Sequence, residues 1–553
     1  MVKITIDGQQ LEVPEGTTIL QAAMNAGIEI PHYCYHPGLS IAGNCRICLV
    51  ELEKAPRPVI ACNTVVAEGM VVYSKSPRAI EWQNGVSEFL LINHPLDCPI
   101  CDQAGECRLQ DYSYRYGQPT TRFVEEKVHG PKRRPLGQHI VFDWERCIKC
   151  TRCIRFCEEV TGTAELGMFL RGVREEIGVF PGRPLDNPYS GNTVDICPVG
   201  ALTLKEFRFR SRLWFLTDVP TVCPGCARGC STMAAVLRNE IFRITPRENQ
   251  AVNRWWICDH GRLWWQRLEQ GGPRRLSGPR GARPAGDDAW ETAYAEAAEL
   301  LATAARGRGV RILASSRAGL EELWLLGQIA RACGAQVHLP QHERGADDEL
   351  LLRRDWTPNA RGAREVLGVL AGGAVSVAEL ERALAEDHVD VLLALGPGLV
   401  GPVDDEPPVI APGALACARS LIVLDAHASA LSDAATVLLP VTGYGESAAT
   451  YVNFAGRVQH APKGLTPRGD VRPARIVLGE FLARLASLEG PPSLAEVQAA
   501  LSRDVPALAA IDWAALPGSG GQDLAGVDAA AQACRPTGAA LKMLAAGLVP
   551  AGT

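Results

Sequence analysis

The sequence predicts a multidomain chain, with α+β domains in the first half and a doubly wound α/β domain in the second. Three observations support this prediction. The 553 residues can supply several hydrophobic cores. Of the 19 cysteines, 16 lie within residues 1–258. Beyond residue 289, apolar runs of strand length alternate with helical patterns, which is typical of a parallel sheet covered by helices.

The composition restricts the classes of function. The formal net charge of −6 is small for this length and argues against a nucleic-acid binder. Cysteines grouped at CxxC spacings favour metal clusters in a reducing compartment over disulfides. The N-terminal residues do not have the pattern of a secretory signal, so we expect none. No apolar run reaches eighteen residues, so we expect membrane contact only through partners.

Residues 1–77 are predicted to form a small β-grasp domain of the ferredoxin type. A strand over residues 2–6, a hairpin turn and a return strand over 11–13 precede a helix that Thr17 or Thr18 can cap. The loop after this helix is rich in cysteine. Four cysteines there are the expected ligands of a [2Fe–2S] cluster: Cys34, Cys45, Cys48 and Cys62.

Residues 78–117 are expected to hold a [4Fe–4S] cluster with one histidine ligand. An amphipathic helix over 78–93 leads into the run HPLDCPICDQAGEC. Zinc would also satisfy this ligand count, but structural zinc sites more often pair two ligands with two others across a longer loop. Because other cysteine clusters flank the run, we favour the iron–sulfur cluster. Its expected ligands are His94, Cys98, Cys101 and Cys107.

Residues 118–215 are predicted to form a ferredoxin-like domain with a second [4Fe–4S] cluster. In two-cluster ferredoxins, the fourth cysteine of each C-x2-C-x2-C-x3-C-P motif ligates the other cluster. The expected ligands are therefore Cys147, Cys150, Cys153 and Cys197. The second motif lacks its first three cysteines, and Tyr189-Ser190-Gly191-Asn192 occupies that region. We therefore expect Cys157 to be a buried free thiol. The Gly-, Pro- and Lys/Arg-rich stretch 117–139 is predicted to be an exposed connection.

Residues 216–270 are predicted to hold a third [4Fe–4S] cluster. Its expected ligands are Cys223, Cys226, Cys230 and Cys258. Four tryptophans near the last ligand predict either a shield between the cluster and water or an ordinary aromatic core. They are Trp255, Trp256, Trp264 and Trp265.

The composition of residues 271–288 predicts a linker to an α/β domain over 289–553. Expected strands lie at 310–315, 336–340, 389–395, 421–426 and 436–441, and expected helices near 290–305, 318–333 and 475–487. Gly396-Pro397-Gly398 is interpreted as a turn, because GxGxxG spacing is missing. A Gly- and Ala-rich tail follows Pro517, with one short helix expected near 538–547.

Together these motifs resemble one family. The histidine–cysteine run, flanked by a ferredoxin-like domain and by CIKCTRC, is similar to the large iron–sulfur subunit of bacterial respiratory complex I, NADH:quinone oxidoreductase. The resemblance is close over residues 1–270. The segments 223–258 and 433–459 also resemble molybdopterin oxidoreductases, so the second half looks like a shortened, degenerate domain of that kind.

The resemblance implies an electron relay with no catalytic residue of its own. One [2Fe–2S] and three [4Fe–4S] clusters would carry electrons from an FMN/NADH-oxidising subunit towards quinone-side iron–sulfur subunits. The relay would use the [2Fe–2S] cluster, the Cys147 cluster and the histidine-ligated cluster, with the Cys223 cluster off the main line. The expected location is peripheral, on the cytoplasmic face of the bacterial inner membrane.

Other functions share parts of the pattern. A subunit of an NAD-linked formate dehydrogenase or hydrogenase would have a similar front end. A formate dehydrogenase needs a longer chain after the clusters and a residue to ligate molybdenum, for which only Cys333 and Cys417 are candidates. We therefore expect no molybdopterin. Iron-only hydrogenases carry active-site cysteine motifs that are missing here, and a zinc-stabilised scaffold would fit the ligands chemically.

Overall fold

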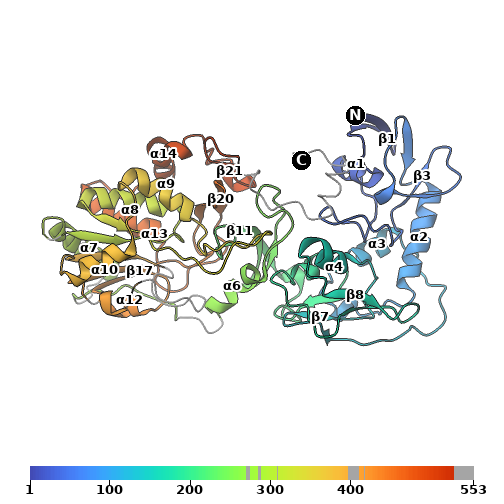
Figure 1. The fold of residues 1–553 in the computed structure, drawn as a ribbon, viewed down its shortest axis with the longest axis horizontal. Helices are drawn as coiled ribbons and strands as arrows, with labels where there is room; N and C mark the ends of the chain where they lie inside the picture. The colour runs from blue at the N-terminus through green and yellow to red at the C-terminus, as the bar shows by residue number, and fades with distance from the viewer. Residues whose placement is uncertain are drawn as a thin grey trace. The chain divides into compact units, whose positions relative to one another are not determined.

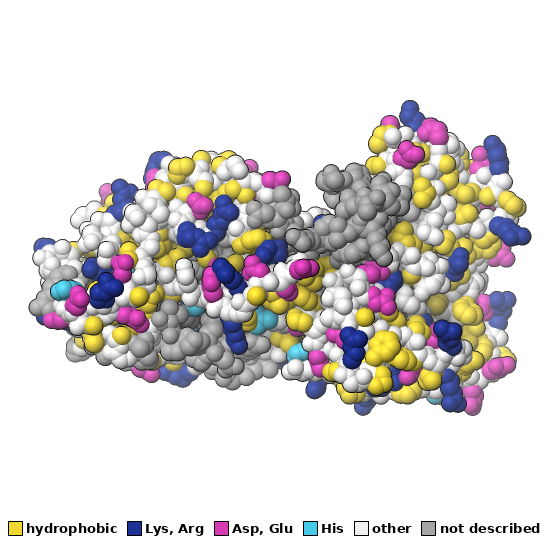
Figure 2. Space-filling view, in the orientation of Figure 1, with side chains coloured by type: hydrophobic (Ala, Val, Ile, Leu, Met, Phe, Trp, Pro, Cys, Tyr) yellow, Lys and Arg dark blue, Asp and Glu magenta, His cyan; other side chains and the backbone are white. Residues whose placement is uncertain are grey.

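The computed structural model describes residues 1–269, 274–283, 288–307, 309–396, 410, 412–415 and 417–528. Their backbone forms two compact units, one of Met1–Leu216 and one that begins at Thr217 (Figure 1). Pro397, Gly398, the helix expected near 538–547 and parts of the predicted linker lie outside the described residues. Among the described helices, none is long and apolar enough to cross a membrane. On the face in Figure 2, basic and acidic side chains are interspersed, in keeping with the small net charge.

The first unit begins with the predicted β-grasp domain. Its sheet has the order β2 (Gln9–Val13), β1 (Val2–Ile6), β5 (Met70–Tyr73), β3 (Leu49–Leu52) and β4 (Val59–Ile60). Strand β1 pairs parallel with β5, and the other pairs are antiparallel. Helix α1 (Ile19–Asn25) starts at Thr18, whose hydroxyl accepts from the Gln21 amide. Its buried residues share one core with β1, so the hairpin and helix predictions are confirmed.

The rest of the first unit consists of short elements that carry cysteine loops. Helix α2 (Pro77–Leu91) confirms the predicted amphipathic helix. The other elements are η1 (Ala61–Asn63), η2 (Cys98–Ile100), α3 (Arg108–Tyr116), α4 (Arg152–Arg155), the π-helical turn η3 (Phe156–Val160), α5 (Asn192–Asp195) and η4 (Leu213–Phe215). The strands are β10 (Leu202–Leu204), β7 (Ile140–Phe142) and β6 (Arg134–Pro135) in one sheet, and the hairpin of β8 (Leu166–Phe169) and β9 (Glu176–Val179).

The second unit begins with an antiparallel sheet of β11 (Thr217–Val222), β12 (Ser231–Leu237) and β13 (Glu240–Pro246), followed by α6 (Asp259–Glu269). Trp264 and Trp265 of α6 pack with apolar residues of β12 and β13 in one core. These two tryptophans therefore form an ordinary aromatic core, one of the two predicted roles.

A five-stranded parallel sheet confirms the predicted doubly wound domain. Its order is β15 (Gln336–His338), β14 (Val310–Leu313), β16 (Val391–Leu395), β17 (Ser420–Asp425) and β18 (Val437–Pro440). Every predicted strand is present. The predicted helices are α7 (Ala289–Ala304), α8 (Leu320–Cys333) and α13 (Ala474–Ala486).

Several elements of this unit were not predicted. The helices are α9 (Ala360–Leu370), α10 (Val377–Ala385), α11 (Pro412–Leu415), α12 (Ala430–Ala434) and α14 (Leu494–Asp504), with short turns η5 (Pro506–Leu508) and η6 (Leu516–Gly518). A small sheet contains β19 (Ala449–Val452), β20 (Arg457–Ala461) and β21 (Gln522–Asp523).

Alternate residues of the parallel strands enter two cores on opposite faces of the sheet. Leu393 of β16 packs with α8, α9 and α13, whereas its neighbour Leu392 packs with α10 and α12. Figure 1 shows α8, α9 and α13 on one side of β17, with α10 and α12 on the other. This arrangement buries both faces and explains why the strands are continuous apolar runs in the sequence.

Two glycines test the packing of helices α8 and α9. A Cβ atom at Gly327 would lie 2.8 Å from the Leu370 side chain, whereas a Cβ at the exposed Gly368 would meet nothing within 4 Å. We expect Gly327→Ala to destabilise the chain by about 1–2 kcal/mol through overpacking. Gly368→Ala should stabilise it by roughly 0.5–1 kcal/mol, because alanine is the better helix former. Scanning calorimetry of the two variants is the measurement, and effects of the same sign would contradict the packing.

Candidate iron–sulfur sites

The four cysteines of the β-grasp domain come together between the loop after α1 and the turn η1. The Cys34 amide donates to Cys45 Sγ at 3.4 Å. Hydrogen bonds with the Cys45 and Cys62 thiols lower the pKa of Cys34, and one with Cys62 lowers the pKa of Cys48. Gly43 and Arg46 flank Cys45 closely and have positive φ angles of 60° and 59°, which the tight loop requires. Three of the thiols are buried and Cys45 is half-buried.

The histidine-containing run follows the carboxyl end of α2. Lys127 Nζ donates to the carbonyls of Leu91 (2.9 Å) and Ile92 (2.7 Å), a favourable place for a cation. Burial, reinforced by the Arg146 and Lys127 charges, lowers the pKa of His94 to about 4. The imidazole is therefore neutral at pH 7, which is the form that ligates metals.

The three thiols of this run also lie near one another. Burial, with the nearby Cys101 and Cys98 thiols, raises the pKa of Cys107 to about 11. Cys101 is buried, Cys107 is half-buried and Cys98 is exposed. The charged groups that act on the His94 ring include Arg146, Lys127 and Asp97, so the structure places the ring beside an ion-pair network as well as in this run.

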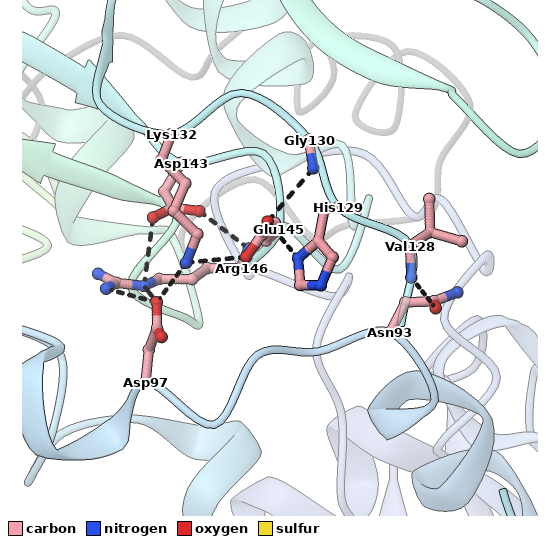
Figure 3. Close-up of polar contacts among 9 residues, drawn as sticks. All are labelled: Asn93, Asp97, Val128, His129, Gly130, Lys132, Asp143, Glu145 and Arg146. Carbon is pink, nitrogen blue, oxygen red and sulfur yellow. Dashed lines mark hydrogen bonds and ion pairs between the residues drawn. The ribbon is translucent and has the colours of Figure 1, made fainter. Parts of the chain in front are cut away.

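That network ties the histidine run to the next cysteine loop (Figure 3). The Asp97 carboxylate accepts from Arg146 Nη2 at 2.9 Å and from Lys132 Nζ at 2.7 Å. Burial alone would raise the pKa of Asp97, but these two hydrogen bonds outweigh it and lower the pKa. Asp97 directly precedes Cys98 and Arg146 directly precedes Cys147, so this pair joins two ligand-bearing loops.

The connection over residues 117–139 takes part in the same network. Lys132 also pairs with Glu145 at 2.8 Å, and His129 Nδ1 lies 3.0 Å from a Glu145 oxygen. The Val128 amide donates to the Asn93 side chain at 2.9 Å (Figure 3). The prediction of an exposed connection holds for most of its residues, but the segment also fixes the position of the histidine run.

The third set of thiols surrounds the start of α4. Burial raises the pKa of Cys153, and the thiols of Cys150, Cys147 and Cys197 add to the effect, so all four are neighbours. Lys149 and Thr151 have left-handed φ angles of 56° and 60°. The first of these turns the Lys149 amide towards Cys147 Sγ, at 3.4 Å. The rule that assigned Cys197 to this set is thus consistent with the fold.

Cys157 is completely buried, as predicted, but beside a carboxylate. Burial raises the pKa of its thiol, and so do the charge of Glu165 and a hydrogen bond donated to it. Glu165 also accepts from Asn187 Nδ2 at 3.0 Å. Ser190 and Asn192 have no exposed surface. Hydrogen-bonded polar side chains therefore fill the region where the second ferredoxin motif lacks its cysteines.

The fourth set belongs to the second unit and is the most enclosed. Strand β11 ends directly before Cys223 and β12 begins directly after Cys230, where the Cys223 amide donates to the Cys230 carbonyl at 2.8 Å. The Gly261 amide donates to Cys258 Sγ at 3.3 Å. A Cβ atom at Gly261 would lie 2.8 Å from Cys223 Sγ, so only glycine permits this approach. All four cysteines are buried.

The three sets of the first unit are close neighbours. Cys45, His94 and Cys147 line one cavity of about 1070 Å³. A Cβ atom at Gly200, three residues after Cys197, would collide with Cys101 Sγ. Cys34 is near enough to Cys150 to contribute, after burial, to its raised pKa. Among the described residues, no group of three His, Cys, Asp or Glu side chains is arranged to hold a single metal ion.

Five family models match the chain in the order that the motifs predict. They are a 2Fe-2S iron-sulfur cluster binding domain (residues 1–77), the NADH-ubiquinone oxidoreductase-G iron-sulfur binding region (83–122), the ferredoxin-like domain of NADH-quinone oxidoreductase subunit 3 (137–203), the molybdopterin oxidoreductase Fe4S4 domain (216–270) and molybdopterin oxidoreductase (375–484). These matches confirm the fold class, and iron–sulfur binding domains of both the 2Fe and the 4Fe type are present.

Curated relatives match the N-terminal half. The NADH-quinone oxidoreductase-G subunit of Rickettsia bellii is 47% identical over 275 residues, which are 49% of this chain and 40% of that protein. The mitochondrial NADH dehydrogenase (ubiquinone) iron-sulfur protein 1 of Solanum tuberosum is 44% identical over 51% of this chain and 38% of its own length. The chain spans about two fifths of the length of these relatives. The resemblance predicted from the motifs is confirmed over this half.

A solved structure of an NAD+-reducing [NiFe]-hydrogenase also matches. It is 29% identical, covers 38% of this chain and 91% of its own chain, and has a TM-score of 0.35.

Cys157 and Cys197 provide a contrast that tests the third set. Both look like fourth cysteines of ferredoxin motifs, but only Cys197 lies among the other three thiols. We expect Cys157→Ala to cost about 1 kcal/mol of stability and to leave the EPR signal of this cluster intact. Cys197→Ala should remove or convert the cluster. If EPR spectra of the assembled complex show the reverse, the assignment of this domain is wrong.

Proposed function

We propose that the chain is the electron-relay iron–sulfur subunit of an NADH:quinone oxidoreductase, respiratory complex I. The observation that supports this most is the convergence of four separate cysteine sets, three of them neighbours within one unit. A line of redox centres without a substrate site is what an electron relay requires. The curated relatives that match the first half carry the names of this subunit.

The ligands that we propose are the residues predicted from the sequence. One [2Fe–2S] cluster is assigned to Cys34, Cys45, Cys48 and Cys62. Three [4Fe–4S] clusters are assigned to His94 with Cys98, Cys101 and Cys107, to Cys147, Cys150, Cys153 and Cys197, and to Cys223, Cys226, Cys230 and Cys258. When bound, each cluster accepts and returns single electrons. Buried, closely spaced thiols are the donors that such clusters need.

The protein contributes burial, hydrogen bonds and close approach. The amides of Cys34, Lys149 and Gly261 donate to cysteine sulfurs. Such bonds stabilise negative charge on sulfur and tune the reduction potential. Glycine at 200 and 261 lets the backbone pass against a cysteine where a side chain would push the sulfur away. These groups hold the ligands in place without water between them.

The proposed order of transfer follows the contacts between the sets. Electrons would pass from an FMN/NADH-oxidising subunit to the Cys34 set, then to the Cys147 set and the His94 set. Contacts between Cys34 and Cys150 and between Gly200 and Cys101 support this order. The acceptors would be quinone-side iron–sulfur subunits, and the Cys223 set would lie off this line.

The domain boundaries that we propose are 1–77, 78–117, 118–215, 216–270 and 289–553. The last domain would serve docking and packing, without molybdopterin. The proposed location is the cytoplasmic face of the bacterial inner membrane, with membrane contact through partners only.

A ligand substitution tests this function. Cys101→Ser should reduce quinone reduction by NADH to near background in membranes, because it interrupts the relay. Reduction of ferricyanide by NADH, which draws electrons at the flavin subunit, should persist and report assembly. The matched control is Cys417→Ser, at an exposed cysteine outside the four sets, and it should retain both activities. Quinone reduction in Cys101→Ser equal to that of the control would contradict the proposal.

A further inference from the structure

Two buried arginines lie between the first and third cysteine sets. Arg152 and Arg155 are on α4 and are 6% and 7% exposed. Arg152 directly precedes Cys153, and Arg155 follows it by two residues. Arginines are seldom buried to this extent unless they are paired with a negative group. Their partners are therefore informative about what occupies the space around them.

Each guanidinium reaches one loop of each set. Arg155 Nη2 donates to the carbonyl of Cys34 at 2.6 Å and to that of Cys150 at 3.2 Å. Arg152 donates to the carbonyl of Ile196, the residue before Cys197, at 3.0 Å, and also to the carbonyl of Tyr35. These contacts cross 44 to 121 residues of sequence. The two side chains thus tie the [2Fe–2S] loop to the ferredoxin-like loop.

No carboxylate balances these two charges within the described part of the chain. The remaining acceptors of Arg155 are the Ser40 carbonyl and the Thr151 hydroxyl, so every partner of both side chains is uncharged. Arg152 Nε is buried and has no partner at all. A guanidinium does not lose its proton in proteins. An unpaired buried ion costs several kcal/mol, so a negative group must lie nearby.

The surrounding histidines do not supply that negative charge. Burial lowers the pKa of His36 to about 3, and the Arg152 and Arg155 charges lower it further. Burial likewise lowers the pKa of His32 to about 4, with Arg108 and Arg152 contributing. By contrast, the Cys150 and Cys197 thiols oppose the effect of burial on Arg152 and raise its pKa. The available anionic groups are therefore the cysteine sulfurs of the two sets.

We propose that Arg152 and Arg155 are shared counter-charges of the two clusters, which hold both reduction potentials up and fix the two ligand loops against each other. This inference rests on the proposed function, because it requires clusters at the Cys34 and Cys147 sets. Reduction adds a negative charge to a cluster, and a fixed positive charge nearby favours that state. Because each guanidinium bonds to both loops, each should act on both clusters.

The sign of the potential shift is the distinctive outcome. Arg152→Gln and Arg155→Gln remove the charge but keep a polar side chain. In the assembled complex, each should shift the midpoint potentials of both clusters downwards in EPR-monitored redox titrations. Arg152→Lys and Arg155→Lys keep the charge and should leave both potentials close to those of the unmodified protein. The control is Arg122→Gln, whose side chain is 84% exposed and pairs with Glu88; it should shift neither potential.

The outcomes separate this inference from the proposed function. If the unmodified complex lacks either EPR signal, the cluster assignment itself fails. If both signals are present and the glutamine variants leave the potentials unchanged or raise them, the counter-charge role fails. If the glutamine variants do not assemble, the lysine variants decide. Lysine variants with both clusters at nearly unmodified potentials support the role, and lysine variants that also lose the clusters contradict it.

Discussion

The first unit depends on one constraint: thiols from distant loops must meet in an interior that excludes water, and their charge must be balanced there. The chain meets it with left-handed residues beside cysteines, amides that point at sulfur, and basic side chains directly beside ligands. Arg155 bonds to the carbonyls of both Cys34 and Cys150, and Arg146 pairs with Asp97 next to Cys98. Removing a ligand or a neighbouring cation therefore affects more than one loop.

The ligand positions were predictable because cluster ligands have local spacing. CxxC runs identify three thiols at a time, and the cross-over rule supplied Cys197. The five parallel strands were predictable because burial on both faces makes segments such as Val391–Leu395 continuously apolar. Short elements such as α10 and the strands β11–β13 were not predicted, because their sequences lack a long periodic signal.

The groups that join the sites could not be predicted, because their partners lie far away in the sequence. Arg155 and Cys34 are 121 residues apart, and nothing in CTRCIRFC indicates which carbonyl the arginine reaches. The pairing of Cys157 with Glu165 and the passage of Gly200 against Cys101 are of the same kind. The only local signal is position, since Asp97, Arg146 and Arg152 each directly precede a predicted ligand.

The central claim is that the four sets hold one [2Fe–2S] and three [4Fe–4S] clusters. Metal and sulfide analysis of anaerobically purified protein, combined with Mössbauer spectroscopy, tests it most directly. The account predicts about 14 iron atoms per chain, with roughly one seventh of them in the [2Fe–2S] environment and no stoichiometric zinc or molybdenum. About 18 iron atoms per chain, or zinc in place of iron at any set, would contradict it.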